Sequence, residues 1–286
     1  MSCYFPDQGE PPFVIPSSLI EPGDYSLITS VLVTDDKKLV MADYFQKEIK
    51  VWLSGSLLKV SIGHIPWSLA LLSDGLVAVT TRDSGKMIDL VNVSGSDPVV
   101  VSTIPLDIEY MGVCQGDGDT LIASSEEGGA RVDVISRDGE VVRTLVDGSG
   151  SSLLREPYFL TRWGDHVYVS DWGSNKVFRV ELETGRVDSV FEGFNLFDLD
   201  LEQPNTVAFD DNGNMYVATG RAHTENQWRV LIVQRNGTSG VFLDSNVLGD
   251  KIPYGMIVDS GSVIVSLCYW EDGYWKSEIR AYAQAA

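Results

Sequence analysis

The chain has 286 residues, of which 44% are hydrophobic and 22% are charged, and this balance excludes an intrinsically disordered or collagen-like protein. Its 41 Asp and Glu residues outnumber 21 Lys and Arg residues, so the formal net charge is −20. A field of this sign repels phosphate backbones and anionic lipid, which disfavours RNA as a partner and argues against membrane binding.

Neither a membrane span nor a secretion signal is expected. The uncharged stretch Ser61–Ser73 is too short and too polar to cross a bilayer. Met1–Ile20 lacks a basic start and carries Asp7 and Glu10 where a signal peptide has an apolar segment. The chain has three cysteines, Cys3, Cys114 and Cys268. Their spacing fits neither a zinc site nor a disulfide framework. Together with the missing secretion signal, this favours reduced thiols and a cytoplasmic location. We also expect the isolated domain to be a monomer and to carry no cofactor.

One short, β-rich apolar run recurs along the chain and is bounded each time by turn-forming residues. In chain order the runs are Leu39–Asp43, Leu76–Thr81, Leu121–Ser125, Val167–Asp171, Met215–Thr219 and Val263–Leu267. Successive runs end roughly 40 to 50 residues apart, a period typical of propeller repeats.

Each run is the second strand of a larger unit. One strand precedes it, a third follows, and in five of the six units a fourth follows as well. The apolar segment Pro11–Ser18 is expected to pair with Glu278–Ala283 and so complete the last unit. Such closure removes exposed sheet edges. The sequence therefore predicts an all-β fold, a six-bladed β-propeller of four-stranded blades closed by the N-terminal strand.

The whole chain, residues 1–286, is expected to form this single propeller. The predicted blades are approximately 25–62, 63–104, 108–146, 155–192, 202–244 and 251–286, the last completed by strand 11–18.

The repeats resemble NHL repeats, most clearly over Leu154–Glu192, where a Pro-aromatic pair, VYVSD and NKV follow one another. Met41–Trp52 and Gln203–Thr219 match the same outline. The arrangement is similar to the C-terminal NHL domains of tripartite-motif (TRIM) proteins, notably the invertebrate TRIM-like ones. That resemblance implies a non-catalytic propeller that recruits a protein, or less readily an RNA, for a RING ubiquitin ligase. The chain has no Cys/His clusters for a RING, so ligase activity is not assigned to it.

Aligning the six units predicts equivalent residues at the start of the innermost strands: Thr29, Trp67, Tyr110, Tyr158, Asn205 and Tyr254. Four of these are large aromatics, which indicates a ring of anchors around the channel mouth that binds a peptide or stacked bases. The alternative is that each ring packs against the next blade. If the rings are anchors, replacing Trp67 and Tyr254 with Ala weakens binding and leaves the melting temperature within a few degrees.

Two further groups are candidate partner-binding residues. Arg155, Arg162 and Trp163 flank the best-formed blade start, and a recognition patch is expected there. The segment Cys268–Lys276, read as a loop between strands, contributes Trp270 and Trp275. The loop Gly220–Gln227 is expected to be a further candidate specificity element.

The alternative function is a metal-dependent hydrolase or lactonase of the gluconolactonase type. Resemblance to that class implies Ca²⁺ held in the channel by a carboxylate and Asn or Asp oxygens, with Asn205, Glu109 or Glu156 as ligands here. The histidines, His64, His166 and His223, occupy unrelated positions, so no zinc site is predicted. No catalytic residue is assigned.

Overall fold

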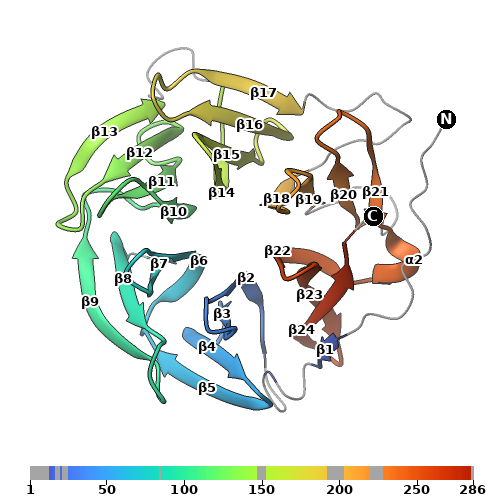
Figure 1. Cartoon of the computed structure of the whole chain (residues 1–286). Coiled ribbons are helices and arrows are strands. Elements are labelled where there is room, and N and C mark those ends of the chain that lie inside the picture. Colours follow the sequence, from blue (N-terminus) through green and yellow to red (C-terminus); the bar gives the residue numbers. More distant parts are fainter. Residues whose placement is uncertain are drawn as a thin grey trace.

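The computed structural model describes residues 13–16, 20, 25–83, 85–146, 153–191, 203–219 and 228–284. These residues form six antiparallel four-stranded sheets, arranged as blades around a central axis (Figure 1). One short helix, α2 (Ser245–Leu248), follows the fifth blade. No helix in the described part of the chain is long and apolar enough to cross a membrane.

The first three blades run outward from the axis in chain order. Blade one contains β2 (Ile28–Val33), β3 (Leu39–Asp43), β4 (Glu48–Leu53) and β5 (Ser56–Ser61). Blade two contains β6 (Ile65–Leu71), β7 (Leu76–Arg82), β8 (Met87–Asn92) and β9 (Val99–Pro105). Blade three contains β10 (Val113–Gln115), β11 (Leu121–Ser125), β12 (Arg131–Ile135) and β13 (Val141–Val146).

The last three blades repeat this order. Blade four contains β14 (Pro157–Trp163), β15 (His166–Asp171), β16 (Lys176–Glu181) and β17 (Val187–Phe191). Blade five contains β18 (Pro204–Phe209), β19 (Met215–Thr219), β20 (Val230–Val233) and β21 (Ser239–Leu243). Blade six contains β22 (Ile252–Asp259), β23 (Ser262–Glu271), β24 (Tyr274–Ala283) and, from the N-terminal segment, β1 (Phe13–Ile15). The predicted propeller is confirmed.

The ring closes through β1, as predicted. β1 pairs antiparallel with β24, placing Val14 opposite Arg280 and Ile15 opposite Ile279. Ile15 is only 1% exposed and packs in the core between blades six and one. The closure therefore combines backbone pairing with hydrophobic burial, and the two ends of the described chain are held in one sheet.

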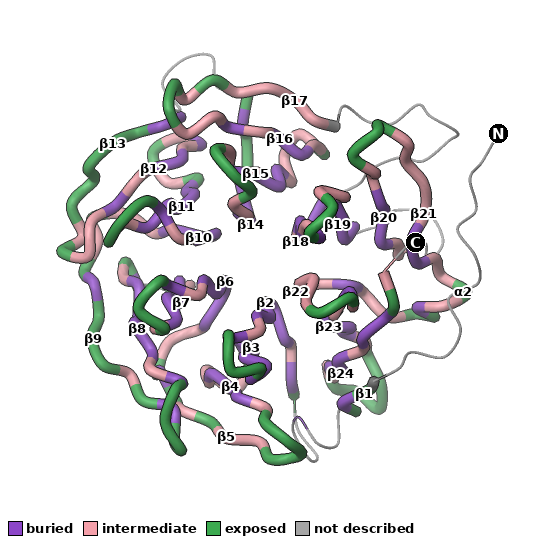
Figure 2. The backbone as a smooth tube through the Cα atoms, in the orientation of Figure 1, coloured by how far each residue is buried: buried purple, intermediate pink, exposed green. Residues whose placement is uncertain are grey.

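The hydrophobic core is divided among the seams between neighbouring blades. Blades one and two share one buried cluster, blades two and three another, and the pattern continues around the ring. As a consequence, the strands near the axis are mainly buried, whereas the outermost strands are intermediate or exposed (Figure 2). Blade-on-blade packing thus covers both faces of each inner strand, which explains why runs such as Leu39–Asp43 are apolar without clear alternation.

Hydroxyl groups join neighbouring blades around the axis. Thr80 on β7 donates from Oγ1 to the carbonyl of Met111 in the next blade at 2.6 Å, and Ser266 on β23 donates from Oγ to the carbonyl of Ile28 at 2.9 Å. Thr206 Oγ1 donates to the carbonyl of Tyr254 at 2.8 Å. These bonds satisfy buried polar groups that the sheets leave unpaired near the axis.

Candidate functional site

One recurring hydrogen bond shows which residues are equivalent at the start of each innermost strand. A backbone N–H of that strand donates to a second-strand hydroxyl in four blades: Ser68 to Thr80, Gly112 to Ser124, Phe159 to Ser170 and Gly255 to Ser266. The residues immediately before these donors are Trp67, Met111, Tyr158 and Tyr254. The equivalent of Trp67 in blade three is therefore Met111, and the predicted assignment of Tyr110 to this position is wrong by one residue.

Tyr110 consequently lies away from the axis. It is 3% exposed, and its hydroxyl donates to Asp133 Oδ2 at 2.7 Å. Arg131 Nε also donates to that carboxylate oxygen, at 2.6 Å. Burial and the bond to Asp133 raise the pKa of Tyr110. A side chain held this way within its blade is a structural group, since a shift of one residue along a strand turns the side chain to the opposite face.

Three of the aromatic starting residues meet at the axis. Trp67, Tyr158 and Tyr254 come from blades two, four and six, and the Trp67 ring centroid lies 5.5 Å from that of Tyr158 and 6.1 Å from that of Tyr254. Phe159 stacks against Trp67 at 5.8 Å. Trp67 is 3% and Tyr158 is 8% exposed. The rings thus fill the upper end of the channel, and we call these four residues the aromatic plug.

We call the face on which the innermost strands begin the upper face, and the face on which they end the lower face. Arg82 lies at the upper face over the plug, with Cζ 4.7 Å from the Trp67 ring centroid and 5.9 Å from that of Tyr158. Glu109 lies 3.9 Å from Arg82 Nε. Burial raises the pKa of Glu109, and the nearby Arg82 opposes that rise. A cation–π contact therefore covers the plug with the chain's own guanidinium.

The remaining starting residues, Thr29 and Asn205, do not build a calcium site. Thr29 Oγ1 donates to the Trp67 carbonyl at 2.8 Å, and Asn205 Nδ2 donates to the Pro253 carbonyl at 3.0 Å. Asn205 Oδ1 is a buried acceptor without a partner among the described residues. One unpartnered amide oxygen falls far short of the six to eight oxygens that Ca²⁺ requires.

The other candidate ligands do not change this result. In the described ranges no group of three or more His, Cys, Asp or Glu side chains is placed to hold a metal. Glu156 is exposed, and Glu109 contacts Arg82. His166 Nδ1 lies 2.6 Å from Asp165, and His223 lies outside the described residues. The side chains that the structure describes therefore do not fit a resident divalent cation.

The predicted patch of Arg155, Arg162 and Trp163 is divided between the two faces. Arg155 precedes β14 at the upper face, whereas Arg162 and Trp163 end that strand at the lower face. A strand advances about 3.3 Å per residue, so roughly 20 Å separates the two ends. The three residues therefore do not form one recognition patch.

The segment Cys268–Lys276 is a strand hairpin, not a loop. β23 and β24 stay paired up to Glu271 opposite Tyr274, and Trp270 stands opposite Trp275 with ring centroids 5.7 Å apart. The two-residue turn has positive φ at Asp272 (55°) and Gly273 (87°), the conformation that favours a tight hairpin. Trp270 is 59% exposed at this tip.

Exposed aromatic side chains gather beside the hairpin on the upper face. Tyr25 lies 4.8 Å from Tyr274 and 5.6 Å from Phe45, ring centroid to centroid. Tyr25 is 40%, Phe45 39% and Tyr274 42% exposed. Trp270 and its partner Trp275 point to the side of the hairpin opposite to Tyr274, because adjacent strand residues alternate. We call Tyr25, Phe45, Trp270 and Tyr274, which surround the hairpin tip on both sides, the upper aromatic surface. The sequence analysis included Trp270 but missed Tyr25 and Phe45, although Phe45 lies two residues after the LVMAD run, in a turn on the face where binding was expected.

Ring contacts connect this surface to the plug. Tyr44 lies 5.1 Å from Phe45 and 6.0 Å from Trp67, centroid to centroid. The exposed rings therefore rest on buried ones and not on a solvated loop. Such support lowers the entropy lost when a partner immobilises them.

No protein-family model matches the chain, and no curated protein matches it in sequence. Solved structures match its fold. A luciferin-regenerating enzyme is 11% identical with a TM-score of 0.69, over 96% of this chain and 97% of that one. The virginiamycin B lyase of Staphylococcus aureus is 12% identical with a TM-score of 0.65, over 94% and 98%. A calcium-binding regucalcin from Agrobacterium tumefaciens is 11% identical with a TM-score of 0.63, over 91% and 92%.

Identities this low show the fold alone. They agree with a six-bladed propeller and carry nothing specific to NHL repeats or TRIM proteins, so that resemblance stays a prediction.

Proposed function

We propose that the protein is a non-catalytic binding propeller that recognises a protein segment through the upper aromatic surface. The observation that supports this is the exposure of four aromatic side chains at the upper face of a rigid scaffold, three of them in contact and Trp270 on the other side of the hairpin tip. Tyr and Trp dominate the residues that contribute most to protein–protein binding, and exposed apolar clusters mark interaction sites. The net charge of −20 favours a segment that carries positive charge.

The proposal keeps some of the predicted binding residues, gives others a supporting role and replaces the rest. Trp270 and Trp275 remain, because their hairpin projects from the upper face. Trp67 and Tyr158 act indirectly, as the buried support of the exposed rings. Tyr110 and the arginine patch no longer belong to the surface, and Tyr25, Phe45 and Tyr274 replace them.

We expect the double substitution Trp270→Ser and Tyr274→Ser to weaken binding at least about tenfold, because it removes one exposed ring from each side of the hairpin tip. Peptides are first selected on the immobilised wild-type chain from a displayed random library. Their dissociation constants are then measured for both proteins by fluorescence polarisation. The melting temperature is expected to change by only a few degrees, as surface substitutions seldom exceed about 0.5 kcal/mol each.

Trp163→Ser is the matched control, because Trp163 is an exposed tryptophan (37%) on the lower face. It is expected to leave peptide binding unchanged. Selected peptides that bind the double variant as tightly as the wild type, or a selection that enriches no peptide, would contradict the proposal.

The alternative, a metal-dependent hydrolase, is favoured by one observation, the unpartnered Oδ1 of buried Asn205 at the channel. A calcium titration separates the two functions. A ligand that binds only the native state stabilises it by RT ln(1 + [L]/Kd) and so raises its melting temperature as the ligand concentration rises. Because the donor set does not fit Ca²⁺, we expect millimolar Ca²⁺ to leave the melting temperature of EDTA-treated protein unchanged.

A calcium-dependent rise in the melting temperature that Asn205→Ala removes would support the alternative. Lactone and ester substrates would then be the next assay. Equal shifts in wild type and Asn205→Ala would instead indicate cation binding elsewhere on this acidic surface.

A further inference from the structure

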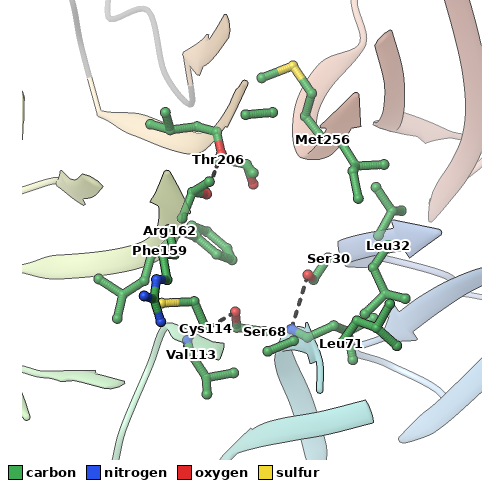
Figure 3. Close-up of a pocket in the computed structure, with 18 of the residues that line it drawn as sticks. Ser30, Leu32, Ser68, Leu71, Val113, Cys114, Phe159, Arg162, Thr206 and Met256 are labelled. Carbon is green, nitrogen blue, oxygen red and sulfur yellow. Dashed lines mark hydrogen bonds between the residues drawn. The ribbon is translucent and has the colours of Figure 1, made fainter. Parts of the chain in front are cut away.

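The central channel contains a cavity of about 400 Å³ lined by the innermost strands of all six blades. Figure 3 shows side chains arranged around an open centre, with the ring of Phe159 directed toward it. This volume lies within the range of small-molecule sites, roughly 300 to 1,000 Å³. The cavity is separate from the upper aromatic surface, since the plug stands between them.

The cavity is closed at one end and open at the other. At the upper end Trp67 packs against Tyr158, Phe159 and Tyr254 across the axis. At the lower end the lining residues include Arg162 and Trp163, and Trp163 is 37% exposed. A ligand can therefore reach the cavity only from the lower face among the described surfaces.

The wall is mainly aliphatic, and three of its hydroxyl groups are already used in hydrogen bonds between neighbouring inner strands. Ser30 Oγ accepts a hydrogen bond from Leu69 N at 3.2 Å, and Ser68 Oγ accepts one from Val113 N at 3.4 Å (Figure 3). Thr161 Oγ1 donates to the Val207 carbonyl. The other lining residues are mainly aliphatic: Val31, Leu32, Val33, Leu69, Leu71, Val113, Leu160, Val207, Met256, Ile257 and Val258.

One charged side chain stands among the described residues that line this cavity, Arg162 at the lower rim. Its Nη2 donates to Asp117 Oδ1 at 2.6 Å, and its Nε donates to the Gly164 carbonyl at 3.2 Å. The Asp117 side chain is 83% exposed, so this ion pair is solvated and weak, and another carboxylate can take the place of Asp117 on Arg162. Nη1 has no partner among the described residues.

We propose that the channel binds an aliphatic monocarboxylate, with its hydrocarbon chain in the cavity and its carboxylate on Arg162. The planar guanidinium matches a carboxylate through two parallel N–H donors, a geometry that a neutral alcohol lacks. The net charge of −20 does not prevent this, since interactions between exposed charges are screened beyond about 8 Å at physiological ionic strength. This site goes beyond the proposed peptide binding and does not depend on it.

Cys114 belongs to the same wall and has a passive role. It is 7% exposed and lies beside Arg162 in Figure 3. Burial raises the pKa of its thiol to about 12, and the nearby Arg162 opposes that rise. The thiol therefore contributes an apolar contact to the hydrocarbon chain, and no covalent step is involved.

Calorimetric titration of the full chain with octanoate, decanoate and 1-octanol tests the proposal. Decanoate is expected to bind roughly tenfold more tightly than octanoate, because two further CH₂ groups leave water. Octanoate is expected to bind at least about fivefold more tightly than 1-octanol, owing to the charge-assisted bonds. Absence of decanoate binding up to millimolar concentration would overturn the proposal.

Two substitutions identify the headgroup contact. Arg162→Gln is expected to abolish the preference for octanoate over 1-octanol, while Arg162→Lys keeps part of it. Arg186→Gln is the matched control, because Arg186 is a solvated arginine on the outer part of the same blade, paired with Asp188 at 2.7 Å. Arg162→Gln protein that still prefers octanoate as strongly as wild type would overturn the assignment of Arg162.

A quenching experiment locates the ligand. With its carboxylate on Arg162, 2-bromodecanoate carries the bromine close to Trp163 and should quench its fluorescence. Quenching is expected to fall in Trp163→Phe and to be unchanged in the Trp270→Ser, Tyr274→Ser double variant. The reverse result would mean adsorption to the upper aromatic surface and would overturn the channel site.

Discussion

Replacing Trp67 with Ala is expected to lower the free energy of unfolding by about 3–5 kcal/mol, the usual cost of deleting a buried tryptophan side chain. The side chain is 3% exposed and contacts four other rings, those of Tyr44, Tyr158, Phe159 and Tyr254. Urea denaturation monitored by circular dichroism measures the loss, and the melting temperature should fall on the order of 10 °C.

This result would separate the two interpretations of the aromatic starting residues. If Trp67 were an exposed anchor, its removal would leave stability within about 0.5 kcal/mol. Trp270→Ala is the control of the same chemical type, because Trp270 is 59% exposed at the hairpin tip and should show only that small effect. Equal stabilities of the Trp67→Ala and wild-type proteins would mean that the plug does not hold the blades together.

Replacing Asp43 with Ala is expected to destabilise the fold by about 3–5 kcal/mol, because it leaves the ammonium of Lys50 buried without its carboxylate partner. The two groups are 2.8 Å apart, and both side chains are 0% exposed. Asp43 also accepts hydrogen bonds from Ser26 Oγ at 2.8 Å and Gln46 N at 3.2 Å. It therefore joins the segment that enters blade one to the turn after β3.

The matched control is Lys37→Ala, which breaks the exposed ion pair with Asp259 at 2.8 Å. Exposed pairs contribute about 0–1 kcal/mol, so this variant should be close to wild type. Removing both buried charges, by Asp43→Asn with Lys50→Met, should destabilise less than Asp43→Ala alone. A double variant that is less stable to unfolding than Asp43→Ala would show that Asp43 acts mainly through its other hydrogen bonds.

Asp171 performs the same capping role in blade four, where the NHL-like pattern is clearest. Its Oδ2 accepts from Arg155 N at 2.7 Å, and its Oδ1 accepts from Ser174 N at 2.8 Å. The aspartate that ends VYVSD and LVMAD thus has a structural explanation. The aspartate that recurs in these two runs secures the chain at the upper face, whatever the propeller binds there.

The repeat alignment from sequence placed the start of blade three one residue too early, at Tyr110 in place of Met111. Blades two, four, five and six place a proline directly before the starting residue, at Pro66, Pro157, Pro204 and Pro253. Blade three has no such proline, and its aromatic was aligned in place of Met111. The glycine shared by blades three and six, Gly112 and Gly255, marks the correct register, because it directly follows the starting residue in both. A Cβ on Gly112 would lie 2.6 Å from the next inner strand, and a Cβ on Gly255 would lie 2.8 Å from the inner strand next to it. Only glycine allows that approach.

The sequence by itself determined the six blades, the strand runs and the closure by the N-terminal strand, because apolar runs and turn-forming residues are properties of neighbouring positions. Only the tertiary structure decided that Trp67, Tyr158 and Tyr254 close the channel, that Arg155 and Arg162 lie on opposite faces, and that Tyr25 meets Tyr274. Whether an aromatic side chain is buried or exposed depends on side chains contributed by other blades, far away in the chain. A local pattern carries no record of those neighbours, so it predicts where each blade begins but not what its first side chain contacts.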